Sequence, residues 1–327
     1  MSEEEIENVK CRICGNAGDN KTYAVREMMF GTRESFRYVQ CAACGCLQIA
    51  EIPPDMSRYY PAGYYSFNLS PQRAFAHRLK NFIKRPRYRY AVLNRGILGR
   101  LLYLLFPNKS LRRLSHVRLT EDSRILDVGC GTGSYLYWLR TIGLTHLLGI
   151  DPYIEKDIEY DNGLRIVKTS LHELEGTWDL IMFNASLEHM PDQLGTLTDA
   201  ARLLEDGGTC LVRIPMVSSY AWEHYGVNWV QLDAPRHLYL HSVRSLTLVA
   251  ERAGLTIDRT LHDSTEFQFW GSEQYVRSIP LVSERSWSEN PSRSIFSPAD
   301  IRTFRRRAED LNRQGRGDQG AFYLKKG

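Results

Sequence analysis

The sequence predicts an α/β protein whose main domain is a doubly wound, Rossmann-like parallel sheet of seven strands. Segments typical of strands and of helices alternate after Thr120, the pattern of a parallel sheet covered by helices. A glycine-rich turn joins the first strand to the first helix, and two matching cysteine pairs precede the domain. We expect strands near 124–129, 147–151, 165–169, 178–184, 209–214, 255–261 and 321–326.

A small N-terminal module, residues 1–65, is predicted from two cysteine knuckles of the form Cys-x-x-Cys-Gly. Two such turns supply four thiolates from compact loops, and zinc binds four ligands tetrahedrally. The ligands would be Cys11, Cys14, Cys41 and Cys44. The chain between the pairs fits a β-hairpin at 21–40, and Cys46 is expected to lie outside the metal site. Buried free thiols, an iron site or a redox pair are the alternatives.

Residues 66–119 are predicted to form a basic helical linker or lid. From Met56 to Thr120 the chain has 14 Lys and Arg and no Asp or Glu, whereas the rest carries 28 basic and 38 acidic residues. Such a block indicates an anionic partner. Apolar residues interleave at helical spacing across 73–113, on either side of Pro86. This stretch is either a peripheral membrane contact or a lid packed on the main domain with a solvated basic face.

The sequence also bears on the cellular compartment. No apolar segment follows Met1, and no run of 18 uncharged apolar residues occurs. Seven cysteines without an export signal do not suggest a disulfide framework. We therefore expect a cytoplasmic protein, with peripheral contact at the inner membrane face if 73–113 binds lipid. The tyrosine cluster at 59–65 would line a pocket or cover a domain junction.

The most informative motif lies at 125–133, Ile-Leu-Asp-Val-Gly-Cys-Gly-Thr-Gly. A dinucleotide fingerprint, G-x-G-x-x-G, would place its third glycine at Ser134. The pattern is instead D-x-G-x-G-x-G, from Asp127 through Gly129 and Gly131 to Gly133. It resembles motif I of the class I S-adenosylmethionine-dependent methyltransferases, and this resemblance implies that S-adenosylmethionine is the methyl donor.

Further segments match that family in order along 120–327. Gly149-Ile150-Asp151 places a carboxylate where the family binds ribose hydroxyls, and 187–192 resembles the LEH-x-PD segment of small-molecule methyltransferases. Ser170 departs from the family, which often has an acidic residue beside adenine. The resemblance implies donor contacts from Asp127, Gly129, Cys130, Gly131, Gly133, Asp151, Pro152, Ser170, Leu171, Asn184 and Ser186.

The acceptor side is expected in insertions at 216–241 and 264–319. An alcohol nucleophile needs a base, and histidine is suited to that role near neutral pH. His237 lies in a loop at the mouth of the sheet that resembles the acceptor region of zinc-ribbon methyltransferases acting on sugars, with His189 as the rival base. Arg236 could hold an anionic group. Segment 268–277 resembles an acceptor lid, and aromatic residues in this half could face a sugar or form core.

We therefore expect methyl transfer to a sugar or glycan precursor, nucleotide-linked or lipid-linked, in surface polysaccharide or deoxysugar biosynthesis. The alternatives are an RNA methyltransferase and a non-catalytic, methyltransferase-like scaffold. Residues 184–187, Asn-Ala-Ser-Leu, lack the Pro-Pro-aromatic pattern of enzymes that methylate exocyclic amines of nucleic acids. Nucleic acid is therefore not the expected partner, and the sequence leaves the oligomeric state open.

Overall fold

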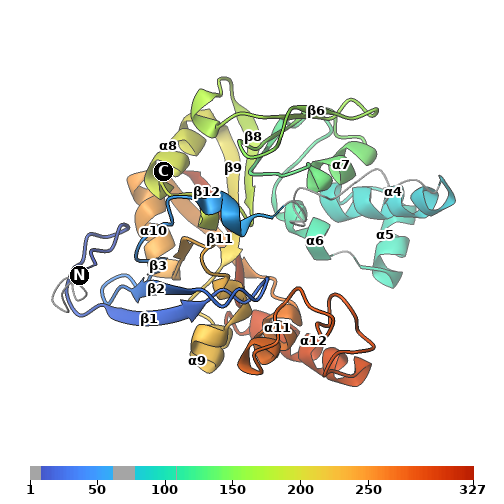
Figure 1. Ribbon diagram of the computed structural model, residues 1–327. Coiled ribbons are helices and arrows are strands. Elements are labelled where there is room, and N and C mark those ends of the chain that lie inside the picture. Colours follow the sequence, from blue (N-terminus) through green and yellow to red (C-terminus); the bar gives the residue numbers. More distant parts are fainter. Residues whose placement is uncertain (1–8, 62–77, 108) are drawn as a thin grey trace.

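The chain is built around an eight-stranded mixed sheet. The computed structural model describes residues 9–61, 78–107 and 109–327 (Figure 1). The sheet order is β11-β12-β9-β8-β4-β5-β7-β6, with the five strands from β9 to β7 parallel. The strands are β4 (Ile125–Val128), β5 (Leu147–Ile150), β6 (Ile158–Glu159), β7 (Arg165–Val167), β8 (Trp178–Asn184), β9 (Leu204–Pro215), β11 (Leu255–His262) and β12 (Gln319–Lys326).

All seven predicted strands are present, but the predicted strand number is wrong by one. The additional strand, β6, has two residues and pairs antiparallel with β7 at the sheet edge. A two-residue strand is too short to show a hydrophobic period, so no sequence pattern predicted it. The last two strands pair antiparallel as expected, and β12 also pairs with β9.

Alternate residues of the central strands enter two separate hydrophobic cores. In β8, Ile181 and Phe183 belong to one core, whereas Leu180 and Met182 belong to the other. This alternation follows from the period of two along a strand. Helices cover both faces, as the predicted doubly wound arrangement requires: α7 (Ser134–Thr141) packs on one face, and α8 (Gln193–Leu203) and α10 (Val243–Arg252) pack on the other. The helices α9 (Tyr220–Tyr225), α11 (Phe267–Val276) and α12 (Pro298–Arg313) lie together beyond one end of the sheet, below it in Figure 1.

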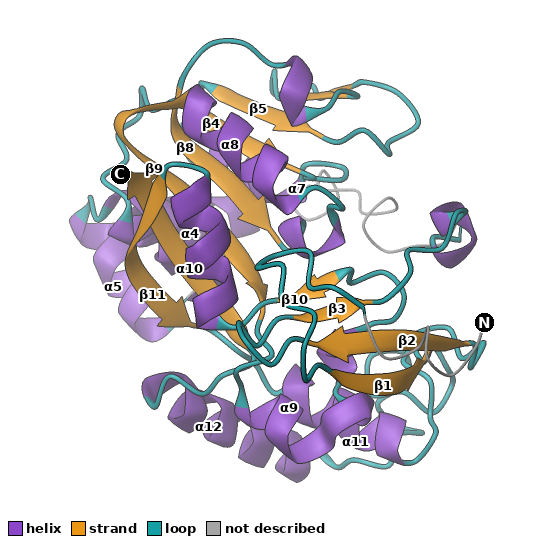
Figure 2. Cartoon of the chain, turned by 90° about the vertical axis from the view of Figure 1, so that its left-hand side faces the viewer, coloured by secondary structure: helices purple, strands orange, loops and turns teal. Residues whose placement is uncertain are grey.

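The N-terminal module forms a second sheet. Strands β1 (Lys21–Arg26) and β2 (Ser35–Gln40) pair antiparallel with Lys21 opposite Gln40, which confirms the hairpin predicted between the cysteine pairs. Strand β3 (Leu47–Ile49) then pairs with β10 (Tyr239–Leu240), far along the chain. Figure 2 shows this sheet beside the large one. The boundaries 65/66 and 119/120 stay predictions, but β10 makes the module's sheet continuous with the later chain.

The segment before β4 is helical: α4 (Arg78–Leu93), α5 (Ile97–Leu105) and the short α6 (Lys109–Arg112). Helix α4 contains Pro86, so the helical spacing expected on either side of this proline belongs in part to one continuous helix. The break comes instead at 94–96, where Asn94 and Gly96 have positive φ angles. Residues 62–77, with part of the tyrosine cluster and the start of the 73–113 stretch, lie outside the described residues. Among the described helices, none has the length and apolar character needed to span a bilayer.

Candidate functional site

The glycine-rich turn between β4 and α7 forms one wall of the site. Gly129, Gly131 and Gly133 all have positive φ angles, of 70°, 54° and 73°. A Cβ atom on Gly129 would lie 2.6 Å from that of Ser186, and one on Gly133 would lie 2.3 Å from Cδ1 of Ile166. Backbone conformation and, at Gly129 and Gly133, the close approach of neighbouring side chains therefore require glycine at the turn.

Two buried carboxyl groups lie below this turn. Asp151, after β5, accepts hydrogen bonds from the backbone N–H groups of Gly131 (2.9 Å) and Tyr153 (2.9 Å). Burial raises the pKa of Asp151, and burial together with the nearby Asp151 charge raises the pKa of Asp127 to about 8. The Asp151 carboxylate stands at the carboxyl end of the second parallel strand, where open α/β sheets bind ribose hydroxyls.

The residues around the turn fit S-adenosylmethionine. Within the described part of the chain, the buried hydroxyl groups of Thr132 and Ser134 have no hydrogen-bond partner, so both are available to hydrogen-bond with a ligand. The remaining predicted donor contacts lie around the same edge of the sheet. Cys130 is in the turn, Pro152 follows Asp151, Ser170 and Leu171 follow β7, and Asn184 and Ser186 end and follow β8.

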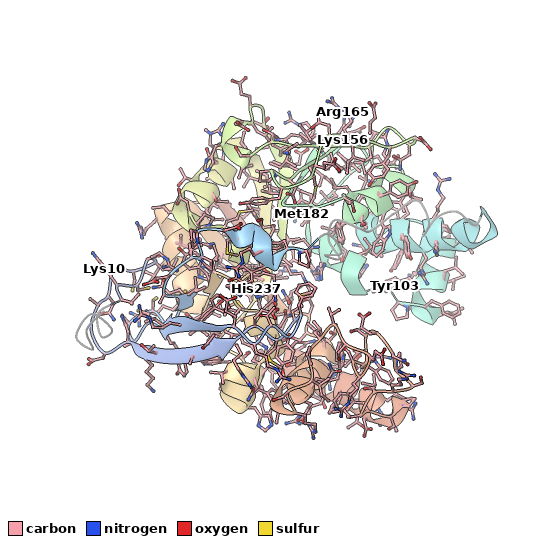
Figure 3. The ribbon with its side chains drawn as sticks, viewed as in Figure 1. Lys10, Tyr103, Lys156, Arg165, Met182 and His237 are labelled. Atoms are coloured by element: carbon pink, nitrogen blue, oxygen red, sulfur yellow. The ribbon has the colours of Figure 1, made fainter. Side chains whose placement is uncertain are left out.

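The two candidate bases, His237 and His189, lie together, with ring centroids 4.7 Å apart. Nδ1 of His237 is 2.7 Å from the Gln231 carbonyl, and Nδ1 of His189 is 2.9 Å from the Arg236 carbonyl. Because a carbonyl only accepts, each Nδ1 carries the proton and each Nε2 keeps its lone pair. Burial lowers the pKa of His237 and lowers that of His189 to about 3. Figure 3 labels His237 near the molecular centre.

Glu188 is a site residue that the sequence analysis did not select. Its side chain is buried, neither carboxyl oxygen has a hydrogen-bond partner among the described residues, and burial raises its pKa to about 8. Ligand atoms of Glu188, His189 and His237 lie within 4.8 Å of one another. Two imidazoles and a carboxylate are a donor set that divalent metals use, but the raised pKa keeps the Glu188 carboxyl group largely protonated at neutral pH, which disfavours a metal here. The LEH motif placed Glu188 next to His189, but only tertiary folding brings His237 to it.

Arg236 does not have the role that its position suggested. Its side chain is fully buried and pairs with Glu27 of the N-terminal module (2.9 Å) and Asp233 (2.6 Å). The prediction that Arg236 holds an anionic substrate group is therefore wrong, because its guanidinium group is already paired with these two carboxylates. Aromatic side chains of the later insertions also enter cores, since Trp229 and Phe269 are fully buried.

The four predicted metal ligands form one cluster. Cys11 Sγ lies 3.6 Å from Cys44 Sγ, Cys14 Sγ lies 3.4 Å from Cys41 Sγ, and all four sulfurs lie within 4.8 Å of one another. A tetrahedral zinc with bonds of about 2.3 Å places its sulfurs about 3.8 Å apart. The arrangement is therefore compatible with zinc. Cys46 is buried elsewhere in the module and is not in the cluster.

The comparisons with known proteins agree with this geometry. A family described as "Methyltransferase domain" matches residues 97–260, half of the chain. A ubiquinone biosynthesis O-methyltransferase of Xanthomonas campestris pv. campestris is 30% identical over 169 residues, covering 44% of this chain and 70% of the relative. The protein of the same name from Xylella fastidiosa is 28% identical over 177 residues, covering 46% and 72%.

Among solved structures, a SAM dependent methyltransferase from Archaeoglobus fulgidus is similar, with a TM-score of 0.41 and 18% identity. That alignment covers 69% of this chain and 98% of the other. The family match and the relatives, together with the glycine turn and Asp151, lead to one identification. The chain belongs to the methyltransferase-domain family and is a class I S-adenosylmethionine-dependent methyltransferase.

Proposed function

We propose that this methyltransferase acts on a hydroxyl oxygen of a sugar or glycan precursor, with His237 as the general base. The observation that carries the proposal is the state of His237. Its Nδ1 is fixed by the Gln231 carbonyl, and its lowered pKa leaves Nε2 unprotonated at neutral pH. An unprotonated, oriented imidazole is the group that an alcohol nucleophile requires.

The reaction is an in-line displacement. The donor supplies a methyl group on a sulfonium; its C–S bond breaks as the acceptor oxygen forms the new C–O bond, and the hydroxyl proton passes to His237 Nε2. The turn at Gly129 would orient the donor; Ser186 and Met190 lie against this turn, and Met190 directly follows His189 in the chain. The burial of His237 keeps water away from the base.

A second acceptor class is favoured by the relatives. The curated relatives are named ubiquinone biosynthesis O-methyltransferases, which supports oxygen as the methylated atom and makes a phenol the alternative to a sugar hydroxyl. A neutral histidine base serves both acceptors. RNA methylation and a scaffold role have less support, because the residues of the donor turn are all present and His237 is buried.

The test compares His237→Gln with His146→Gln, a control at an exposed position outside the insertions expected to bind the acceptor. We expect His237→Gln to lower methyl transfer by about 10²–10⁴-fold and to leave the Kd for S-adenosylmethionine nearly unchanged. Mass spectrometry of nucleotide sugars, lipid-linked sugars and phenols would identify the acceptor. Methyl transfer by His237→Gln at the wild-type rate would remove His237 as the base. Transfer to phenols alone would replace the sugar proposal.

A further inference from the structure

The outward face of α5 exposes a continuous set of large apolar side chains. Ile97 is 84% exposed, Leu104 68% and Leu105 70%. The full set follows helical spacing along one face and continues past the helix end: Ile97, Leu98, Leu101, Leu104, Leu105 and Phe106. Monomeric soluble proteins rarely leave such a contiguous patch in water, so this face is expected to have a partner.

The opposite face of α5 is packed and holds the helix in place. A Cβ atom on Gly99 would lie 2.3 Å from the Pro86 carbonyl oxygen, so glycine lets α5 approach α4 closely. The rings of Tyr90 and Tyr103 lie 5.7 Å apart between the two helices. Figure 1 shows the hairpin of α4 and α5 on the side of the large sheet away from β1 and β2. The hairpin thus directs the apolar face outward, not onto the catalytic domain.

The chain segment that forms this face carries only basic charge. No Asp or Glu occurs from Met56 to Thr120, and 14 Lys and Arg do. Arg95 and Arg100, which flank and interrupt the apolar set, are both exposed. A second copy of this face would therefore place two basic surfaces against each other, whereas an anionic surface would complement it.

We propose that the outward face of α5 docks on an anionic lipid bilayer, with the helix lying in the plane of the interface. Its leucine and isoleucine side chains enter the boundary between headgroups and acyl chains, and the surrounding Arg side chains contact lipid phosphates. With nine residues, α5 lies on the bilayer and does not cross it.

The docked face is connected to the catalytic edge of the sheet. After α6, the buried Arg113 pairs with Asp263 and lies 3.4 Å from the side-chain oxygen of Asn184, at the end of β8. Docking would therefore hold the site near the membrane surface. The sequence suggests two forms of sugar acceptor, and a site held near the membrane favours the lipid-linked form over the nucleotide-linked form. This last step rests on the proposed function.

The experiment measures co-sedimentation of the full chain with vesicles, without donor or acceptor. We expect binding to phosphatidylcholine vesicles that contain about 30% phosphatidylglycerol, and weak binding to phosphatidylcholine alone. Raising NaCl from about 0.1 M to 0.5 M should weaken the binding, because salt screens the basic contacts. The variant Leu101→Gln/Leu104→Gln/Leu105→Gln should bind at least about 10-fold less.

The matched control is Val243→Gln/Val276→Gln/Val282→Gln, three exposed apolar residues outside this face, which should bind as the wild type does. S-adenosylmethionine binding checks that each variant is folded. Three results would overturn the proposal: wild type that stays in the supernatant, a leucine variant that binds normally, or a dimer that only the leucine variant abolishes. Because no methyl acceptor is present, failure here is separate from failure of the proposed function.

Discussion

At the residue scale, burial determines which groups are charged. The structure encloses three histidines, His189, His237 and His241, and lowers the pKa of each. His241 has no place in the proposed chemistry. It bonds Ser245 through Nδ1 and Gln193 through Nε2, each at 3.0 Å, at the start of α10. Neutral imidazole therefore serves as a base at one position and as a structural hydrogen-bonding group at another.

We expect His241 to make the fold sensitive to acid. Burial lowers its pKa from 6.5 to about 4, so the unfolded chain binds its proton more readily, and stability is lost as pH falls below 6.5. When the pH falls from 6.5 to about 5, the free energy of unfolding of wild type should decrease by about 2 kcal/mol more than that of His241→Gln. The raised pKa values of Asp127 and Glu188 act in the opposite direction, but they are common to both proteins.

Urea unfolding at the two pH values measures this difference. Equal losses for the two proteins would show that His241 does not contribute.

A second residue-scale expectation concerns the proposed base: since the pKa of His237 is lowered, the acid limb of kcat/KM should lie below pH 6.5. This limb should disappear in His237→Gln.

At the element scale, the loop from 231 to 242 connects the two sheets. Its end supplies β10, which pairs with β3, and its carbonyl groups at Gln231 and Arg236 orient the two histidines. Arg236 fixes the loop from within, because its fully buried side chain bridges Glu27 and Asp233. The loop conformation therefore depends on contacts that come from nearly the whole length of the chain.

We expect Arg236→Ala to lower the free energy of unfolding by about 3–5 kcal/mol, because it leaves two carboxylates buried without their cation. The control Arg293→Ala removes an exposed pair with Glu284 and should change stability by less than about 0.5 kcal/mol. Denaturant titration of both variants gives the comparison. If Arg236→Ala lowered the free energy of unfolding no more than Arg293→Ala does, the ion pairs of Arg236 would not contribute to stability.

At the scale of the whole molecule, the cysteine module takes part in shaping the acceptor site. The hydroxyl of Tyr38, in β2, donates to the His237 carbonyl at 2.8 Å, and Tyr60 OH lies 3.3 Å from His189 Nδ1. The predicted donor contacts, by contrast, all come from residues 127–186, around the large sheet. If the module is held by zinc, the metal should affect acceptor chemistry more than donor binding.

This is tested with Cys41→Ser and the control Cys46→Ala, a cysteine outside the four-sulfur cluster. Cys41→Ser should lose its zinc. Its rate of methyl transfer should fall about 10²-fold, because the loop that carries His237 is displaced, while its affinity for S-adenosylmethionine stays near that of wild type. Metal analysis, calorimetry and a methyl-transfer assay give the three readouts. Full zinc content in Cys41→Ser would rule out the four-thiolate site.

Local patterns in the sequence determined the parts of this protein that follow from short segments. The period of two, the turn glycines and the knuckle spacing predicted seven of the eight strands, the hairpin at 21–40 and the grouping of four cysteines. Residues 125–133 also predicted the donor turn and the methyltransferase class, because a glycine turn and its strand lie within nine consecutive residues.

Only the tertiary structure decided what depends on contacts between distant segments. It placed Glu188 beside His237, assigned Arg236 to Glu27, and extended the module's sheet with β10. It also decided that the apolar face of α5 points outward, because an amphipathic helix shows the same spacing whether that face meets a core or a membrane. Contacts between residues 49 positions apart (Glu188 and His237) or 209 positions apart (Glu27 and Arg236) leave no local period, so short segments could not have predicted them.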